Sequence, residues 1–301
     1  MGSGSFDAKA YRSFTATTSG KTTDEIYKSR TIHASLNPLG VKVRESRDSV
    51  DNPNSTPLIV ALDVTGSMNV LADVIAREGL GILFNSVLER KPITDPHVMF
   101  MAVGDANFDH FPLQVSQFEA DNRIVEQLTQ IFIEHGGGGN EFESYNLPWY
   151  FAAFHTVHDS IEKRGRRGYL FTVGDENAPR DLTRDQIRKF IGDELQSELG
   201  TRQMLEMAQR AYNVFHIIIE EGSHARASLG KVQDTWRNLL GQNVISLADH
   251  KLLAQTIVSA MEVAEGASAE DSAMAWGAGS TIVHAAVRNL PKSAAPKLLG
   301  A

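Results

Sequence analysis

The sequence predicts an α/β fold with a doubly wound, mostly parallel central sheet and helices on both of its faces. Apolar runs of strand length alternate along the chain with segments in which apolar residues recur at helical spacing. A run that is apolar throughout is typical of a strand buried on both faces, as in a parallel sheet. Because parallel neighbours are joined by crossovers, the intervening helices are expected to cover the sheet.

The first strand of the central sheet is expected where the apolar run 58–62 leads directly into Asp63. A second apolar run ends in Gly104-Asp105, and a third ends in Gly174-Asp175. The full set of predicted strands, in chain order, is a short strand at 41–43, then 58–62, 97–103, an antiparallel hairpin strand at the sheet edge near 112–118, 169–173, 214–219 and a short strand at 244–247.

Helices are predicted where apolar residues recur every three or four positions. Such residues run from Met68 to Leu88 and from Leu147 to Ile161. The other predicted helices are 122–133, 183–191, 200–211, 225–240, 249–263 and 280–289. The segment 136–144 is expected to be a loop, because its consecutive glycines disfavour any regular element.

These elements indicate one α/β domain with an extension at each end. We expect an N-terminal arm and polar extension over 1–56, the α/β domain over 57–265, and a C-terminal extension over 266–301 that forms a helix and then a flexible tail. The hydrophobic fraction of 42% is enough for a sizeable core in a chain of 301 residues.

Composition argues against several kinds of protein. The formal net charge of −8 disfavours a generally basic nucleic-acid-binding surface. The chain has no cysteine, which excludes disulfides, thiol catalysis and cysteine-ligated zinc. No apolar run approaches the roughly 20 residues that span a bilayer, and the first five residues lack the pattern of a secretion signal. A soluble cytoplasmic protein is therefore expected.

Oxygen-bearing side chains gather where the predicted strands end. Asp63, Thr65 and Ser67 follow the first strand, the glycine-rich loop 136–144 follows a helix, and Asp175 follows a later strand. In open α/β sheets ligands bind in the crevice at the carboxyl ends of the strands. Hard oxygen donors suit Mg²⁺ or Mn²⁺, so these three segments predict a divalent metal site.

A simpler interpretation is that Asp63 or Ser67 caps the helix that follows, since Asp and Ser are favoured N-caps. Capping accounts for one of these residues but not for three converging segments. Asp105, which follows the second strand, is interpreted as a turn residue.

This order of segments resembles the von Willebrand factor A (VWA) domain family, of the intracellular bacterial and phage type, and its metal-ion-dependent adhesion site. That site combines an Asp-x-Ser-x-Ser loop, a Thr from a glycine-rich loop and an Asp after a later strand. The resemblance covers about residues 57–263 and implies a Rossmann-like VWA fold. It rests mainly on Asp63-Val64-Thr65-Gly66-Ser67-Met68 after a buried strand.

The chain departs from the family pattern at two places. Thr65 replaces the first Ser, which keeps the hydroxyl group. The Thr of the glycine-rich loop is absent, and alignment of the glycines places Asn140 there, with Glu143 close behind. Either residue, or both, can supply oxygen to Mg²⁺.

The resemblance implies a metal-dependent protein-binding module without catalytic residues. Mg²⁺ (or Mn²⁺) would be held by Ser67, Thr65 and the second-loop residue, with Asp63 and Asp175 binding directly or through water. An open position would accept an acidic side chain from a partner protein, and a MoxR-type AAA+ ATPase is the first partner to test. The alternatives are a Mg²⁺-dependent phosphoester hydrolase and a self-assembling structural protein.

Histidines offer a weaker alternative. His155 and His158 could hold zinc on one side of a helix, but without a nearby Glu pattern we expect a solvated helix face. His216 lies inside an apolar strand and is expected to be a hydrogen-bonded core histidine.

Overall fold

The computed structural model describes residues 4–18, 20–74, 79–133 and 141–292. Within these ranges, only the backbone is described for Thr18, Ser67, Asn69, Val70, Ala72 and Leu80. The predicted tail beyond residue 292 lies outside the described residues, as does most of the glycine-rich loop.

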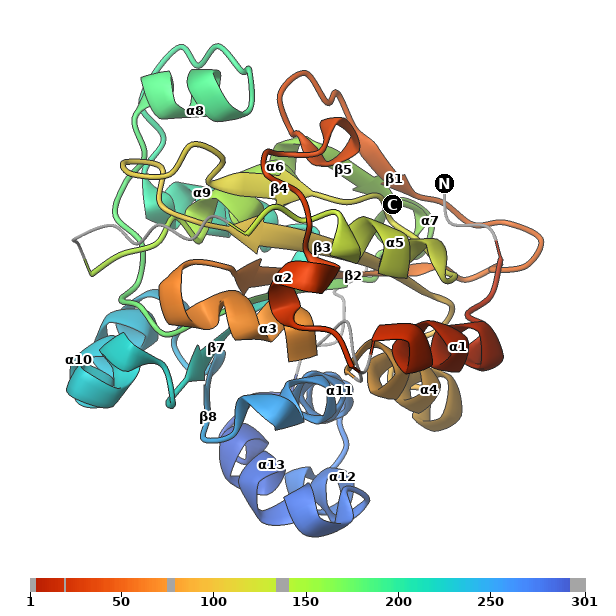
Figure 1. Cartoon of the computed structure of the whole chain (residues 1–301). Helices are drawn as coiled ribbons and strands as arrows, with labels where there is room; N and C mark the ends of the chain where they lie inside the picture. The colour runs from red at the N-terminus through yellow and green to blue at the C-terminus, as the bar shows by residue number, and fades with distance from the viewer. Residues whose placement is uncertain (1–3, 19, 75–78, 134–140, 293–301) are drawn as a thin grey trace.

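The central sheet of the described chain has six strands in the order β4-β3-β2-β6-β7-β8 (Figure 1). The strands are β2 (Thr56–Asp63), β3 (Pro96–Val103), β4 (Leu113–Val115), β6 (Gly168–Gly174), β7 (Tyr212–Ile219) and β8 (Val244–Leu247). All neighbours pair in parallel except the edge strand β4, which runs antiparallel to β3. The predicted α/β class, with one antiparallel edge strand, is confirmed.

Helices cover both faces of this sheet (Figure 1). One face carries α3 (Val70–Val74), α4 (Leu80–Arg90), α5 (Arg123–Thr129), α11 (Leu253–Ala264) and α13 (Ser280–Val287). The other carries α6 (Asn146–Phe154), α8 (Arg184–Phe190), α9 (Thr201–Ala208) and α10 (Ser223–Leu240). α12 (Ala269–Met274) packs against α11 and α13.

The two cores meet at β2, which is buried at every position. Leu58, Val60 and Leu62 belong to the core under α4 and α11, whereas Ile59 and Ala61 belong to the core under α6 and α9. Successive side chains of a strand point to opposite faces, so the unbroken apolar run is what a strand covered on both faces requires. Its last residue, Asp63, is therefore held rigidly at the carboxyl end of a central strand.

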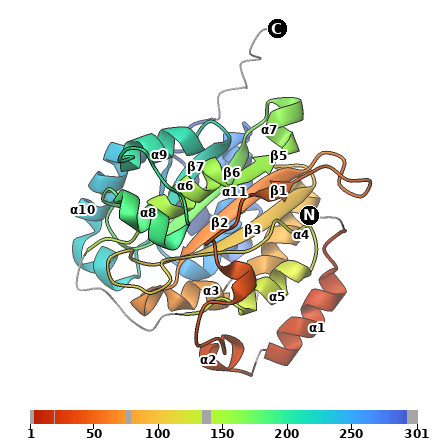
Figure 2. The ribbon, with the colours of Figure 1, turned by 90° about the horizontal axis from the view of Figure 1, so that it is seen from above.

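The N-terminal residues pack onto the domain. α1 (Ala8–Thr18) and α2 (Thr23–Ile26) lie on the outside of the molecule, and α1 contacts α4 (Figures 1 and 2). Phe6 stacks on Phe84 of α4 with ring centroids 4.5 Å apart, and Tyr11 is buried. Apolar anchors thus attach a segment whose overall composition is polar.

The predicted helix from Leu147 to Ile161 is wrong as a single element. α6 ends at Phe154, β5 (Thr156–His158) follows, and α7 (Asp159–Arg164) begins after it. β5 pairs in parallel with β1 (Arg44–Ser46) to form a separate small sheet. The β-branched residues 156 and 157 fit a strand, and the tertiary pairing decides between strand and helix here.

This break also corrects the expectation for two histidines. His155 and His158 are buried rather than on a solvated helix face. The ring of His158 accepts a hydrogen bond from Ile161 N and so caps α7.

The predicted helix from Met68 to Leu88 is described only in part. A short 3-10 helix (Gly66–Asn69) precedes α3, and α4 begins at Leu80, with residues 75–78 outside the described ranges.

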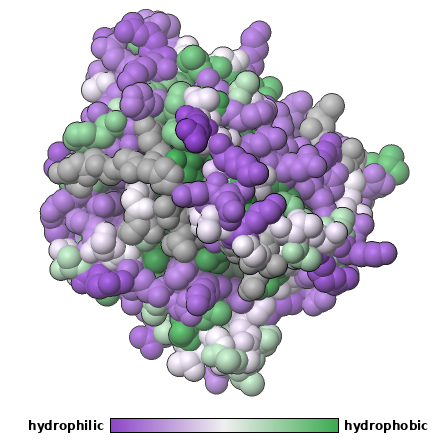
Figure 3. Space-filling model, in the orientation of Figure 1, coloured by the Kyte–Doolittle hydropathy of each residue, from purple (hydrophilic) through white to green (hydrophobic). Residues whose placement is uncertain are grey.

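The face shown in Figure 3 is mostly hydrophilic, with apolar residues in small separate patches. No helix in the described ranges is long and apolar enough to cross a membrane.

Alanine at Gly81 tests the packing of α1 on α4. A Cβ at Gly81 would collide with the ring of Tyr11, and such overpacking is expected to lower the free energy of unfolding by about 1–3 kcal/mol. Gly230 of α10 is the matched control, because a Cβ there meets open space. Gly230→Ala is expected to raise the free energy of unfolding by about 0.5–1 kcal/mol. Urea unfolding followed by circular dichroism measures both, and an equal gain in the two variants would contradict the packing of α1.

Candidate metal centre

The carboxyl ends of the central strands bring acidic side chains to one edge of the sheet. Asp63 is the last residue of β2, and the register places it beside Val103, the last residue of β3. Asp105 follows β3 after one glycine, and Asp175 follows β6 directly. All three acidic side chains are buried.

Asp63 is fixed by hydrogen bonds to both of its carboxylate oxygens. Oδ1 accepts from the backbone N of Thr65 at 2.9 Å and from the Thr65 hydroxyl at 2.7 Å. Oδ2 accepts from the hydroxyl of Tyr145 at 2.8 Å. The first two bonds fold the chain back over the strand end, as Asp side chains commonly do in turns.

The ring of Tyr145 lies in the aromatic core, and its hydroxyl group contacts Asp63. Its ring packs edge-on against His216 and Trp236 at centroid distances of 5.0 and 5.4 Å. A side chain at Gly174 would collide with the Tyr145 hydroxyl, so glycine at the end of β6 is needed for this contact. Burial raises the pKa of Tyr145 well above its usual value, which keeps its hydroxyl group a donor.

His216 is the core histidine that the sequence predicts. It is fully buried, its Nδ1 lies 2.8 Å from Thr172 Oγ1, and its ring stacks on Trp236. Burial lowers its pKa well below the usual value, so the ring is neutral.

Glu143 carries the least compensated charge of the group. Its Oε1 lies 3.1 Å from Thr65 Oγ1, but that hydroxyl has one hydrogen, which Asp63 also accepts. Its Oε2 is buried and has no hydrogen-bond partner among the described residues. Burial and the charge of Asp63 raise the pKa of Glu143 well above its usual range.

Further carboxyl groups surround this pair. Asp109 and Asp105 also raise the pKa of Glu143, and burial followed by Asp175 raises that of Asp63. Asp175 itself accepts a hydrogen bond from His224 N, in the first turn of α10, at 2.8 Å. A helix N-terminus favours negative charge, which accounts for the position of this carboxylate.

Glu176 adds another acid to the same edge. Its Oε2 is buried without a hydrogen-bond partner in the described part of the chain, and lies 3.5 Å from His224 Nδ1. Burial and the charges of Asp175 and Asp63 raise its pKa to about 8. Burial and the charges of neighbouring carboxyl groups thus raise the pKa values of Asp63, Glu143 and Glu176 together.

The structure places the predicted ligands as follows. The Thr65 hydroxyl contacts both Asp63 and Glu143, and Asp175 acts on Asp63 through its charge. Asn140 and the side chain of Ser67 lie outside the described residues. Tyr145, Asp109 and Glu176 were not predicted. Glu176 directly follows Gly174-Asp175, one of the two Gly-Asp pairs at strand ends, and its position in the sequence could have indicated it. The sequence gives no sign of the contact from Tyr145.

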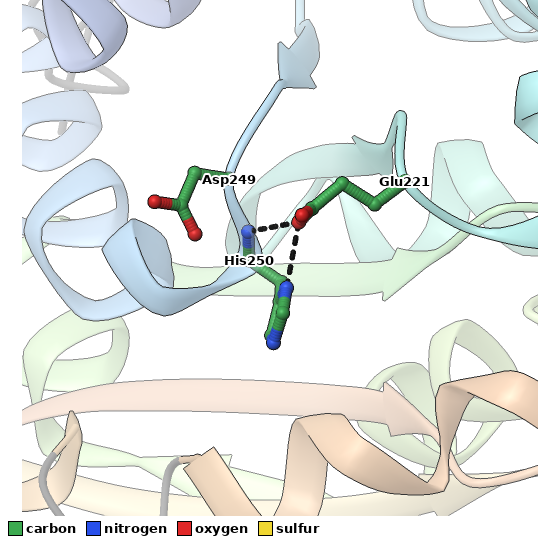
Figure 4. A group of neighbouring side chains, drawn as sticks. All are labelled: Glu221, Asp249 and His250. Carbon is green, nitrogen blue, oxygen red and sulfur yellow. Dashed lines mark hydrogen bonds and ion pairs between the residues drawn. The ribbon is translucent and has the colours of Figure 1, made fainter.

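The three predicted carboxylates do not yet form a closed coordination shell. In the described ranges, acidic or histidine ligand atoms that all lie within 4.8 Å of one another occur at Glu221, Asp249 and His250 instead (Figure 4). There, N and Nδ1 of His250 both bond to Glu221 Oε2, while Asp249 accepts from Lys251 N. These bonds are local caps after β7 and β8, so the grouping needs no ion to explain it.

The residues at the Asp63 edge fit a hard divalent cation. The donors are carboxylate and hydroxyl oxygens, and the buried Oε2 of Glu143 points to a missing positive partner. Mg²⁺ usually keeps several waters, so Asp63 and Asp175 can both serve without meeting directly.

Solved structures that resemble this chain include two with low sequence identity. The pilus adhesin SpaC from Lactobacillus rhamnosus GG, in its open conformation, matches 69% of this chain at 9% identity with a TM-score of 0.46. A von Willebrand factor type A protein from Catenulispora acidiphila matches 69% at 13% identity with a TM-score of 0.34. The chain spans 30% and 42% of these two chains, respectively. No protein-family model and no curated protein matches the sequence. Likenesses this distant carry no argument about the site.

Removal of the Tyr145 hydroxyl tests its bond to Asp63. Tyr145→Phe keeps the ring contacts but leaves Asp63 Oδ2 without its donor. The pKa of Asp63 is then expected to rise, and Mn²⁺ affinity at neutral pH to fall by about tenfold for one pKa unit. Tyr212→Phe is the control, because the Tyr212 hydroxyl bonds to Thr156 away from the crevice. Calorimetric Mn²⁺ titration of both variants measures this, and equal affinities would contradict it.

Rising pH is expected to destabilise the metal-free protein above about pH 7. Folding raises the pKa of Glu143 and Glu176, so the folded chain keeps protons that the unfolded chain has lost. The free energy of unfolding then falls by up to about 1.4 kcal/mol per pH unit for each retained proton. The buried histidines His97, His158 and His216 have lowered pKa values and act in the opposite sense, but only below about pH 6.5.

Urea unfolding in EDTA between about pH 7 and about pH 9 measures this dependence. Excess Mg²⁺ is expected to restore stability, because it binds the folded chain. A free energy of unfolding in EDTA that stays constant or rises over this range would show that the crevice holds no excess protons.

Proposed function

We propose that this protein is a divalent-cation-dependent protein-binding module. Mg²⁺ or Mn²⁺ would bind at the carboxyl edge of the central sheet and join the protein to its partner. The fold supports this proposal, because the crevice at that edge is where open α/β sheets bind ligands.

The buried, unpartnered Oε2 of Glu143 carries the proposal. A buried carboxylate oxygen that makes no hydrogen bond destabilises the folded protein by more than one ordinary hydrogen bond stabilises it. Glu143 also lies beside Asp63, whose own pKa is raised. A divalent cation would compensate both groups at once, which a single hydrogen-bond donor would not.

In this proposal Asp63, Thr65, Glu143 and Asp175 supply the described ligands, directly or through water. Ser67 and Asn140 complete the set that the VWA resemblance implies. The open coordination position would take an acidic side chain of a protein partner, and a MoxR-type AAA+ ATPase is the first candidate. We place this activity in the cytoplasm.

Metal binding by Asp63 is tested with purified protein. Asp63→Asn keeps the size of the side chain but removes its charge and one of its two acceptor oxygens, and is expected to lower Mn²⁺ affinity at least about tenfold. Asp271→Asn is the matched control, because Asp271 of α12 borders the same cavity as Thr56, at the opposite end of β2 from Asp63, and this variant should bind as the parent does. Unchanged affinity in Asp63→Asn would sink the proposed site.

The partner is tested by affinity capture from the native host in Mg²⁺, in EDTA and with Asp63→Asn. A partner that depends on the metal is captured only in the first condition. Retention in all three would show that docking does not use the metal. A parallel assay with phosphoester substrates separates binding from hydrolysis, because Asp63-dependent turnover would replace the binding proposal by an enzyme.

A further inference from the structure

His155 faces oxygen atoms at both of its ring nitrogens. It caps the C-terminal end of α6, is 7% exposed and stacks on Phe151. Nδ1 lies 2.8 Å from the carbonyl oxygen of Val41 and 3.2 Å from that of Lys42. Nε2 lies 2.7 Å from Asp193 Oδ2.

None of these oxygens is a natural donor. Carbonyl oxygens only accept, and so does an ionised carboxylate. Asp193 Oδ2 already accepts from the Tyr150 hydroxyl at 2.6 Å. A neutral imidazole has a single N–H, so one of its nitrogens would turn a lone pair toward an acceptor.

Asp193 is the charged group that faces the ring from the neighbouring elements of the described chain. Its side chain is 32% exposed. Tyr150 lies one turn before His155 in α6, and burial together with Asp193 raises its pKa, so its hydroxyl remains a donor. The remaining contacts of the ring are the two backbone carbonyls and Phe151.

We infer that His155 is protonated on both ring nitrogens, and that this imidazolium fastens the polar extension before the central sheet onto the domain. Its Nδ1–H holds the chain at Val41, and its Nε2–H is paired with Asp193. Loss of one proton leaves an acceptor facing an acceptor and releases this segment.

Backbone contacts define which segment the imidazolium holds. Arg44 N donates to the carbonyl oxygen of His155 at 2.7 Å, where β1 begins to pair with β5. Gly40 N donates to Ile191 O at 3.3 Å. Residues 37–40 and β1 are therefore attached on both sides of the His155 ring.

The segment that His155 holds borders one end of a loop of the candidate metal centre. Pro38 and Leu39 border a small cavity together with Phe111 and Phe190. Phe111 ends the loop that carries Asp105 and Asp109 at the metal edge. The His155 contact, a proton-dependent clasp, thus holds a segment that borders the same cavity as the end of that loop.

Two measurements in EDTA test the clasp without involving the metal. Proton–nitrogen NMR of the His155 ring is expected to show two protonated nitrogens at about neutral pH. Amide exchange protection of Arg44 N–H is expected to fall at least about tenfold as the ring loses a proton at higher pH.

Asp193→Asn is the diagnostic variant, because an amide can donate to an unprotonated Nε2. Protection of Arg44 N–H in this variant is expected to become independent of the ring's charge. His33→Gln is the control, since the ring of His33 bonds to Ser35 within the same extension. An unprotonated ring nitrogen with full protection of Arg44 N–H, or unchanged pH dependence in Asp193→Asn, would overturn the inference.

Discussion

Uncompensated negative charge at the carboxyl edge of the sheet is the constraint that organises the candidate site. Asp63, Glu143 and Glu176 are held in a crevice where burial and mutual repulsion raise their pKa values. The position of Asp63 is fixed, because β2 is buried on both faces and cannot shift without disrupting both cores. A protein keeps such a cluster only if protons or a cation balance it.

The same constraint explains neighbouring features that packing alone would not require. Tyr145 gives its hydroxyl to Asp63 rather than to the core around it, and Gly174 leaves room for that contact. Asp175 lies at the first turn of α10, where the helix dipole offsets part of its charge. Each of these two contacts stabilises the negative charge of one carboxylate, whereas Glu143 Oε2 has no hydrogen-bond partner among the described residues. The proposed cation site rests on this unsatisfied oxygen.

Much of the fold could be predicted because its strands are buried on both faces and read as unbroken apolar runs. The break at His155 could not, since helical spacing of apolar residues continues through β5 and only its pairing with β1 makes it a strand. Asp63, Thr65 and Asp175 could be placed from their positions at strand ends. Glu143 could be identified as a candidate ligand only because its glycine-rich loop resembles that of the VWA family. Tyr145 could not be predicted, because its contact depends on how α6 approaches β6.

Proton release on metal binding tests the central claim most directly. Calorimetric titration with Mn²⁺ at about pH 7, repeated in buffers of different ionisation enthalpy, counts the protons that each ion displaces. If the crevice retains protons in place of a cation, binding should release about one or more protons per ion. Binding without proton release, or release that persists unchanged in Asp63→Asn, would contradict the account.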